Sequence, residues 1–152
     1  MVARTWSVVA LIAATVAFGA CSQESSRSTA KVDDDDPATV AHVAGTDLKT
    51  VTLSSRAEER LGIKTEQVRE VSRAGMPGPV KAVPPAALIY DKNGSAWVYT
   101  AKQARTYVRA KVEVDTIEEG LVLLDLGPPP GTDVVIVGAA ELLGVELGVG
   151  GG

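Results

Sequence analysis

Runs of glycine, proline and asparagine interrupt the chain from residue 75 onward and restrict it to strands and turns. The runs are Gly75–Pro79, Asp91–Gly94, Glu118–Gly120 and Gly127–Gly131. Proline fixes φ and lacks an amide hydrogen, and Asn-Gly favours hairpin turns because both residues tolerate positive φ. The sequence therefore predicts a mainly β fold, a small antiparallel barrel or sandwich with one short helix and about six or seven strands.

The segments between these turns carry strand patterns. Ala87–Tyr90 and Ala96–Tyr99 flank the Asn-Gly turn and predict a hairpin. Residues 108–115 alternate strictly, which predicts that the apolar side chains face a core, namely Val108, Ala110, Val112 and Val114. Residues 121–126 are nearly all apolar, which indicates a strand covered on both faces, and residues 134–137 are expected to form a central strand.

Helix signals are few. Ser55 is followed three residues later by Glu58, which has the form of a capping box, and Leu61-Gly62 gives an apolar last turn and a glycine stop. We also expect one helical turn over residues 139–143. The Gly-rich residues 144–152 are expected to be a disordered tail.

The N-terminus carries export signals. Residues 1–20 combine a basic start, an apolar run over residues 8–18 and small residues before Cys21. The run is too short to span a bilayer as a helix. Phe18-Gly19-Ala20-Cys21 resembles the bacterial lipobox, which implies cleavage after Ala20 and lipid attachment at Cys21. The alternative is an ordinary signal peptide whose cleavage leaves a cysteine.

The leader predicts an exported protein, lipid-anchored at the outer face of a bacterial membrane, in the periplasm or at the cell surface. Residues 21–47 follow as a flexible acidic tether, because they are rich in serine and aspartate and have few large apolar groups. The aspartate run 33–36 lacks the alternating ligands and the glycine of a calcium-binding loop.

Composition argues against several other functions. The formal charge is −4 and the basic residues are dispersed among carboxylates, which disfavours a nucleic-acid surface. One cysteine and one histidine, His42, are too few for a disulfide, a cysteine zinc site or a Ser/His/Asp site, so we expect no cofactor or metal. We expect no enzyme either, since the available carboxylates fall at predicted turns or on solvent-facing strand positions, namely Asp91, Glu113, Asp115 and Asp133.

Several stretches together resemble one family. Residues 83–99, with their Val-Pro start, acidic hairpin turn and Trp-Val-Tyr strand, are similar to the C-terminal region of periplasmic adaptor subunits of RND-type efflux systems, the HlyD-like membrane fusion proteins. Residues 107–114, 131–138 and 53–65 resemble other parts of these adaptors.

The resemblance covers residues 48–143 and implies an adaptor-like β domain corresponding to the membrane-proximal part of an adaptor. A complete adaptor also has a lipoyl-like domain and a long α-helical hairpin, and there is no room for either between Val71 and Val80. The implied function is non-catalytic docking on an RND-like inner-membrane transporter or a full-length adaptor. The alternative is a stand-alone extracytoplasmic binding or sensing lipoprotein, because a fold does not fix a function.

Two residues are the candidates for partner binding. Arg105 and Tyr107 are expected to be exposed, with Tyr107 on the polar side of its strand, and arginine and aromatic side chains are common interface anchors. The alternative is that Tyr107 pairs with a neighbouring strand. Trp97 and Tyr99 could form an aromatic ligand surface, although core or cross-strand packing is the favoured interpretation.

Overall fold

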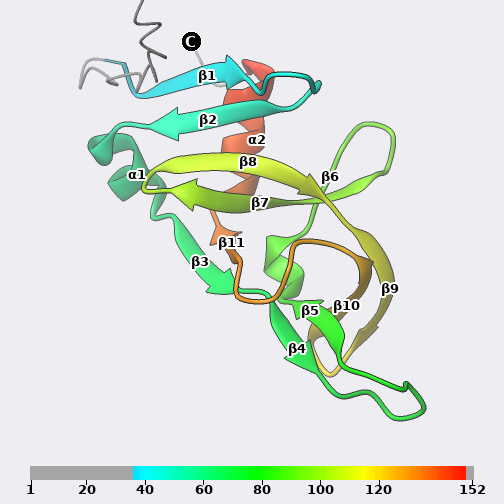
Figure 1. The fold of residues 1–152 in the computed structure, drawn as a ribbon. Helices are drawn as coiled ribbons and strands as arrows, with labels where there is room; N and C mark the ends of the chain where they lie inside the picture. The colour runs from blue at the N-terminus through cyan, green and yellow to red at the C-terminus, as the bar shows by residue number, and fades with distance from the viewer. Residues whose placement is uncertain (1–35, 150–152) are drawn as a thin grey trace, which may run out of the picture. The chain divides into compact units, whose positions relative to one another are not determined.

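The computed structural model describes residues 36–149, which form two antiparallel sheets and two α-helices (Figure 1). The helical segments are α1 (Ser55–Leu61), the 3-10 turn η1 (Pro85–Ala87) and α2 (Ala139–Leu147). The strands are β1 (Ala38–His42), β2 (Lys49–Leu53), β3 (Lys64–Gln67), β4 (Arg69–Val71), β5 (Val80–Val83), β6 (Ile89–Tyr90), β7 (Ala96–Gln103), β8 (Thr106–Lys111), β9 (Glu113–Glu118), β10 (Leu121–Leu126) and β11 (Asp133–Val137).

The larger sheet has the strand order β1-β2-β8-β7-β11-β3, and β6 also pairs with β7. The predicted hairpin is confirmed, since Ile89 lies opposite Trp97 and Gly94 turns the chain with a φ of 79°. The predicted central strand is confirmed as well, because β11 lies between β7 and β3.

The smaller sheet has the order β4-β5-β10-β9. It is irregular, with register shifts on both sides of Leu124 where β10 pairs with β9. Neither sheet closes on itself within residues 36–149, so the mainly β prediction is confirmed as a sandwich-like arrangement and not as a barrel.

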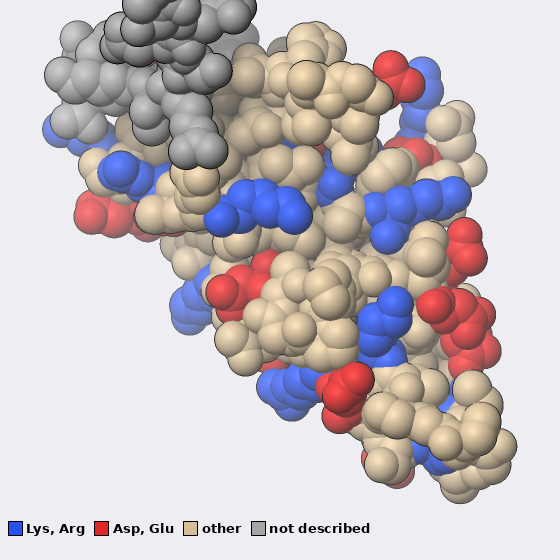
Figure 2. All heavy atoms as spheres, in the orientation of Figure 1, with Lys and Arg blue, Asp and Glu red and all other residues tan. Residues whose placement is uncertain are grey.

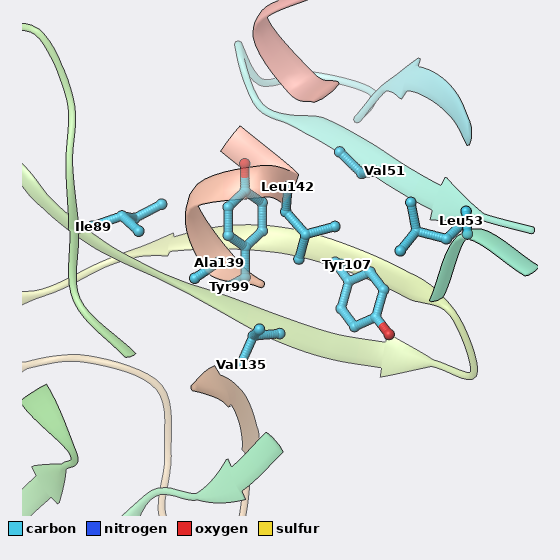
Figure 3. Packing of buried hydrophobic residues seen from close by; sticks show 9 residues of the cluster. Val51, Leu53, Ile89, Tyr99, Tyr107, Val135, Ala139 and Leu142 are labelled. Atoms are coloured by element: carbon cyan, nitrogen blue, oxygen red, sulfur yellow. The ribbon is translucent and has the colours of Figure 1, made fainter. Parts of the chain in front are cut away.

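Two apolar clusters hold the domain together, and the larger sheet contributes to both. Tyr99 belongs to the cluster under α2 and its neighbour Val98 to the cluster shared with the smaller sheet. Successive strand residues point to opposite faces, so both faces of β7 are covered. Figure 3 shows the cluster under α2, in which Ala139 and Leu142 of the helix lie against side chains from several strands.

The first helix begins one residue earlier than the capping box predicts. Its N-cap is Ser54, whose hydroxyl accepts a 3.2 Å hydrogen bond from the amide of Ala57. Glu58 is thereby free to take a partner outside the helix. The glycine stop is confirmed, because Gly62 adopts a left-handed conformation with a φ of 60°.

Two boundary predictions are wrong. Residues 21–47 were expected to be a tether, but β1 (Ala38–His42) lies within that range and pairs along its length with β2. Residues 144–152 were expected to be a disordered tail, but α2 continues to Leu147. Pairing and packing with distant segments order both stretches, which local composition does not reveal.

The predicted signal peptide and Cys21 lie outside the described residues. So do most of the predicted tether and residues 150–152 at the end of the tail. Among residues 36–149, no helix is both long enough and apolar enough to cross a membrane.

Candidate functional site

The two predicted partner-binding residues lie close together, but only one is exposed. Arg105 sits in the turn between β7 and β8, while Tyr107 is 2% exposed and belongs to the cluster under α2. The prediction that Tyr107 is an exposed anchor is therefore wrong. The alternative, pairing with a neighbouring strand, is correct, because Tyr107 lies opposite Val51 of β2 and Ala101 of β7.

The error has a physical origin in β8. The alternating pattern predicts one buried face, but β8 lies between β2 and β7, and its faces meet different neighbours. Tyr107 packs in the cluster under α2, whereas Ala110 packs against the cluster shared with the smaller sheet. A strand covered on both faces cannot be oriented by alternation alone.

Tyr107 also has a half-buried polar partner. Its hydroxyl donates a 2.5 Å hydrogen bond to Glu58 Oε1 on α1. Burial and this carboxylate both raise the pKa of Tyr107 above its ordinary value. The bond joins the first helix to the centre of the larger sheet, so the role of Tyr107 is structural.

Arg105 holds an unusual backbone conformation. Its φ is 58°, in the left-handed region that favours glycine, and its carbonyl accepts a 2.9 Å hydrogen bond from the amide of Leu53. Its side chain lines a polar hollow of about 430 Å³ together with Lys102, Glu58 and Asp133. This turn is the part of the predicted site that can meet a partner.

The aromatic pair of β7 divides between two roles. Tyr99 is fully buried, which confirms core packing, and Figure 3 shows its hydroxyl directed toward α2. Trp97 is half-buried, the guanidinium of Arg109 lies 4.8 Å from its ring centroid, and its Nε1 donates a 3.1 Å hydrogen bond to Asp91 Oδ2.

A buried carboxylate ties these side chains to the second helix. Glu146 is 3% exposed and accepts hydrogen bonds from the Tyr99 hydroxyl at 2.5 Å and from Arg109 Nη2 at 2.8 Å. Burial, followed by the hydrogen bond to Glu146, raises the pKa of Tyr99 above its ordinary value. Sequence analysis missed this network, although a glutamate between Val145 and Leu147 in a mainly apolar helix is a signal that it has a partner.

Of the carboxylates considered for catalysis, Asp91 and Asp115 have structural partners. Asp91 stabilises the hairpin turn by accepting hydrogen bonds from the amides of Asn93 and Ser95 and from Trp97. Desolvation acts to raise its pKa, but the bonds from Trp97, Ser95 and Asn93 outweigh it, so the pKa of Asp91 is lowered. Asp115 forms an ion pair with Arg73.

Glu113, Asp133 and His42 lie at exposed positions. Among the described residues, no group of three histidine, cysteine or carboxylate side chains could hold a metal ion. Figure 2 shows basic and acidic side chains interspersed over the face in view.

An apolar groove lies at the edge of the domain where the described chain begins. It is half-open, has a volume of about 450 Å³ and is bounded by β1, α1 and the end of α2. The apolar lining comes from Pro37, Ala38, Val40, Leu53, Ala57, Leu61 and Val145, with Asp36 and Arg60 as the charged members. No local sequence pattern indicates this groove, because its walls come from segments far apart in the chain.

Comparison with known proteins does not assign a function to this site. No protein family, curated protein or solved structure matches the chain.

Proposed function

We propose that the chain is an exported lipoprotein, anchored by lipid at Cys21, whose β domain docks without catalysis on a membrane transporter or a full-length adaptor. The proposal starts from the resemblance of residues 83–99 to periplasmic adaptors. In the fold this stretch runs from the end of β5 through η1 and β6 into β7, and so it links the smaller sheet to the larger.

The observation that carries the proposal is the direct pairing of β4 with β5. Val71 lies opposite Val80, and residues 72–79 connect them. This is where the resemblance places the lipoyl-like domain and helical hairpin of a complete adaptor. A sheet that is continuous across this point supports a self-contained β domain, equivalent to the membrane-proximal part of an adaptor.

Arg105 is the proposed docking residue of this domain. An arginine in the left-handed region costs about 1 kcal/mol or more relative to glycine. Its side chain is exposed at a hairpin tip beside Lys102. An exposed arginine at a strained turn suits an interface anchor, because function can outweigh such a local cost.

This function is tested by a pull-down in which the lipidated chain captures membrane proteins and the captured proteins are identified. Arg105→Gly removes the side chain and relieves the backbone strain, so the melting temperature should hold or rise while capture of a transport protein falls. Glu119→Gly is the matched control, since Glu119 is the other described non-glycine residue with positive φ, at 50°. Glu119→Gly should leave capture unchanged. Finding no transport protein with the unaltered chain contradicts the proposal.

The second candidate function is a stand-alone binding or sensing lipoprotein. The apolar groove of about 450 Å³ favours it, because sites for small ligands are concave, mostly apolar and largely preformed. This candidate would be supported over docking if the capture experiment finds no transport protein and the purified protein retains a small molecule.

A further inference from the structure

We infer that the apolar groove is a lipid-contact site, which takes up one acyl chain of a zwitterionic phospholipid from the bilayer that holds the protein. The inference deepens the proposed function and rests on it for the membrane as the partner. It is carried by the lining of the groove, its rim, its neighbouring surface and its place in the chain.

The walls of the groove are suited to a hydrocarbon chain. Half-buried side chains form much of the lining, among them Ala38 of β1, Leu61 of α1 and Val145 of α2. Uptake of an acyl chain removes this apolar lining from water, which is the favourable term, because the chain itself leaves hydrocarbon and not water. The volume of the groove, about 450 Å³, lies within the range of small-ligand sites.

Apolar surface continues beyond the groove. A second hollow of about 320 Å³ shares Val40, Val145 and Gly148 with it and adds Leu147, and its other lining residues are His42, Lys49 and Glu146. Val40 is 41% exposed and Leu147 is 60% exposed, and Val149 follows at 77%. Figure 1 shows the C-terminal end of α2 beside β1, at the same edge of the domain. Contiguous exposed aliphatic side chains beside a groove mark an interaction surface.

The charges at the groove select the class of lipid. Arg60 and Asp36 both line it, and among the ion pairs of the described residues none includes either of them. One charge of each sign matches the phosphate and the ammonium of a zwitterionic headgroup. The ammonium of phosphatidylethanolamine can also donate a hydrogen bond to a carboxylate such as that of Asp36, whereas the quaternary ammonium of phosphatidylcholine has no hydrogen to donate. A purely anionic headgroup would meet Asp36 with a charge of the same sign.

The lipid proposed at Cys21 would hold the domain at the membrane. Asp36, which lines the groove, is separated from Cys21 only by residues 22–35. A fully extended chain spans at most about 3.6 Å per residue, so residues 22–35 allow at most about 55 Å between Cys21 and Asp36. Tethering raises the effective concentration of bilayer lipid, so a weak site is sufficient.

Vesicle binding by the exported Cys21→Ser chain tests the inference without the covalent lipid. The probes are vesicles of phosphatidylcholine alone and of phosphatidylcholine with phosphatidylethanolamine, used in flotation and in titration. We expect measurable binding that is stronger with phosphatidylethanolamine. Leu147→Asp should weaken vesicle binding at least about tenfold, because the free energy of burying one leucine side chain corresponds to at least that change in affinity. Ile117→Asp, on β9 and matched at 59% exposure, should leave it unchanged.

A variant that fills the groove separates uptake of an acyl chain from simple surface adhesion. Ala38→Phe adds apolar area and occupies the groove. If the groove takes up an acyl chain, this variant should bind vesicles more weakly while its melting temperature is unchanged. If the surface only adheres to the bilayer, the variant should bind vesicles equally or more strongly. Equal or stronger binding overturns the inference. So does binding of soluble lysophosphatidylethanolamine without binding of vesicles, or equal loss in the Leu147→Asp and Ile117→Asp variants. Because the test uses unlipidated protein and no transporter, its failure is distinct from failure of the docking proposal.

Discussion

The hydroxyl of Tyr99 donates a 2.5 Å hydrogen bond to Glu146 Oε2 and so joins the middle of β7 to the last turn of α2. Arg109 reaches the other carboxylate oxygen at 2.8 Å, and its own Nε has no partner among the described residues. Lys49 Nζ bonds the backbone carbonyl of Glu146 at 3.1 Å. Side chains from β7, β8 and β2 thus all bond to one residue of α2.

This network predicts a large loss of stability when Glu146 is replaced by alanine. The change leaves Arg109, whose side chain is 13% exposed, without its carboxylate, and breaking a buried ion pair costs about 3 to 5 kcal/mol. Tyr99→Phe should cost about 1 to 3 kcal/mol, since it removes one hydrogen bond. Urea unfolding measures both. Glu66→Ala, which breaks the exposed pair with Arg69, should cost under about 1 kcal/mol, and an equal cost for Glu146→Ala would contradict this account.

A second prediction concerns Tyr107, whose burial overturned its assignment as an exposed anchor. Tyr107→Ala should destabilise the domain by about 3 to 5 kcal/mol, because it opens a cavity between α1 and the larger sheet. Tyr107→Phe keeps the ring and should cost about 1 to 2 kcal/mol through loss of the bond to Glu58. A thermal melt of Tyr107→Ala within the error of the unaltered protein would mean that the side chain does not pack as described.

Alkaline pH should unfold the domain through its buried tyrosines. The pKa values of Tyr99 and Tyr107 are raised above the ordinary value of 10.0. Because the folded state retains these protons while the unfolded state releases them, the stabilisation is complete below pH 10 and declines as the pH rises further. Tyrosinate absorbance and circular dichroism should change together in this range. Ionisation of both tyrosines in a protein that is still folded would contradict the prediction.

The first strand predicts a boundary for truncation. Deleting residues 22–35 from the mature chain should leave the melt nearly unchanged if they lie outside the domain. Deleting residues 22–46 also removes β1, which pairs with β2 from Ala38 opposite Leu53 to His42 opposite Lys49. That loss exposes part of the cluster under α2 and should lower the melting temperature by at least about 4 °C. Equal melts for the two deletions would show that β1 contributes nothing to stability.

Local signals in the sequence predicted the fold better than they predicted the site. The hairpin at Asn93-Gly94 and the glycine stop at Gly62 depend on backbone preferences of the residues themselves, and both are confirmed. The strand β1 was missed because its small and polar residues are ordered by pairing with β2.

The groove, the Glu146 network and the burial of Tyr107 all depend on where α2 packs. Alternation in one strand carries no information on a helix from the other end of the chain. The predicted site therefore retained Arg105, whose exposure comes from its own turn, and lost Tyr107, whose environment is set by distant residues.

Photo-crosslinking from position 105 in intact membranes tests the docking function most directly. A crosslinking amino acid replaces Arg105 in the lipidated chain, and the same replacement at Glu119 is the control. The account predicts an adduct with a membrane transporter or a full-length adaptor from position 105, none from position 119, and loss of the adduct in Cys21→Ala. A folded, membrane-bound protein that yields no adduct with any transport protein from position 105 would contradict it.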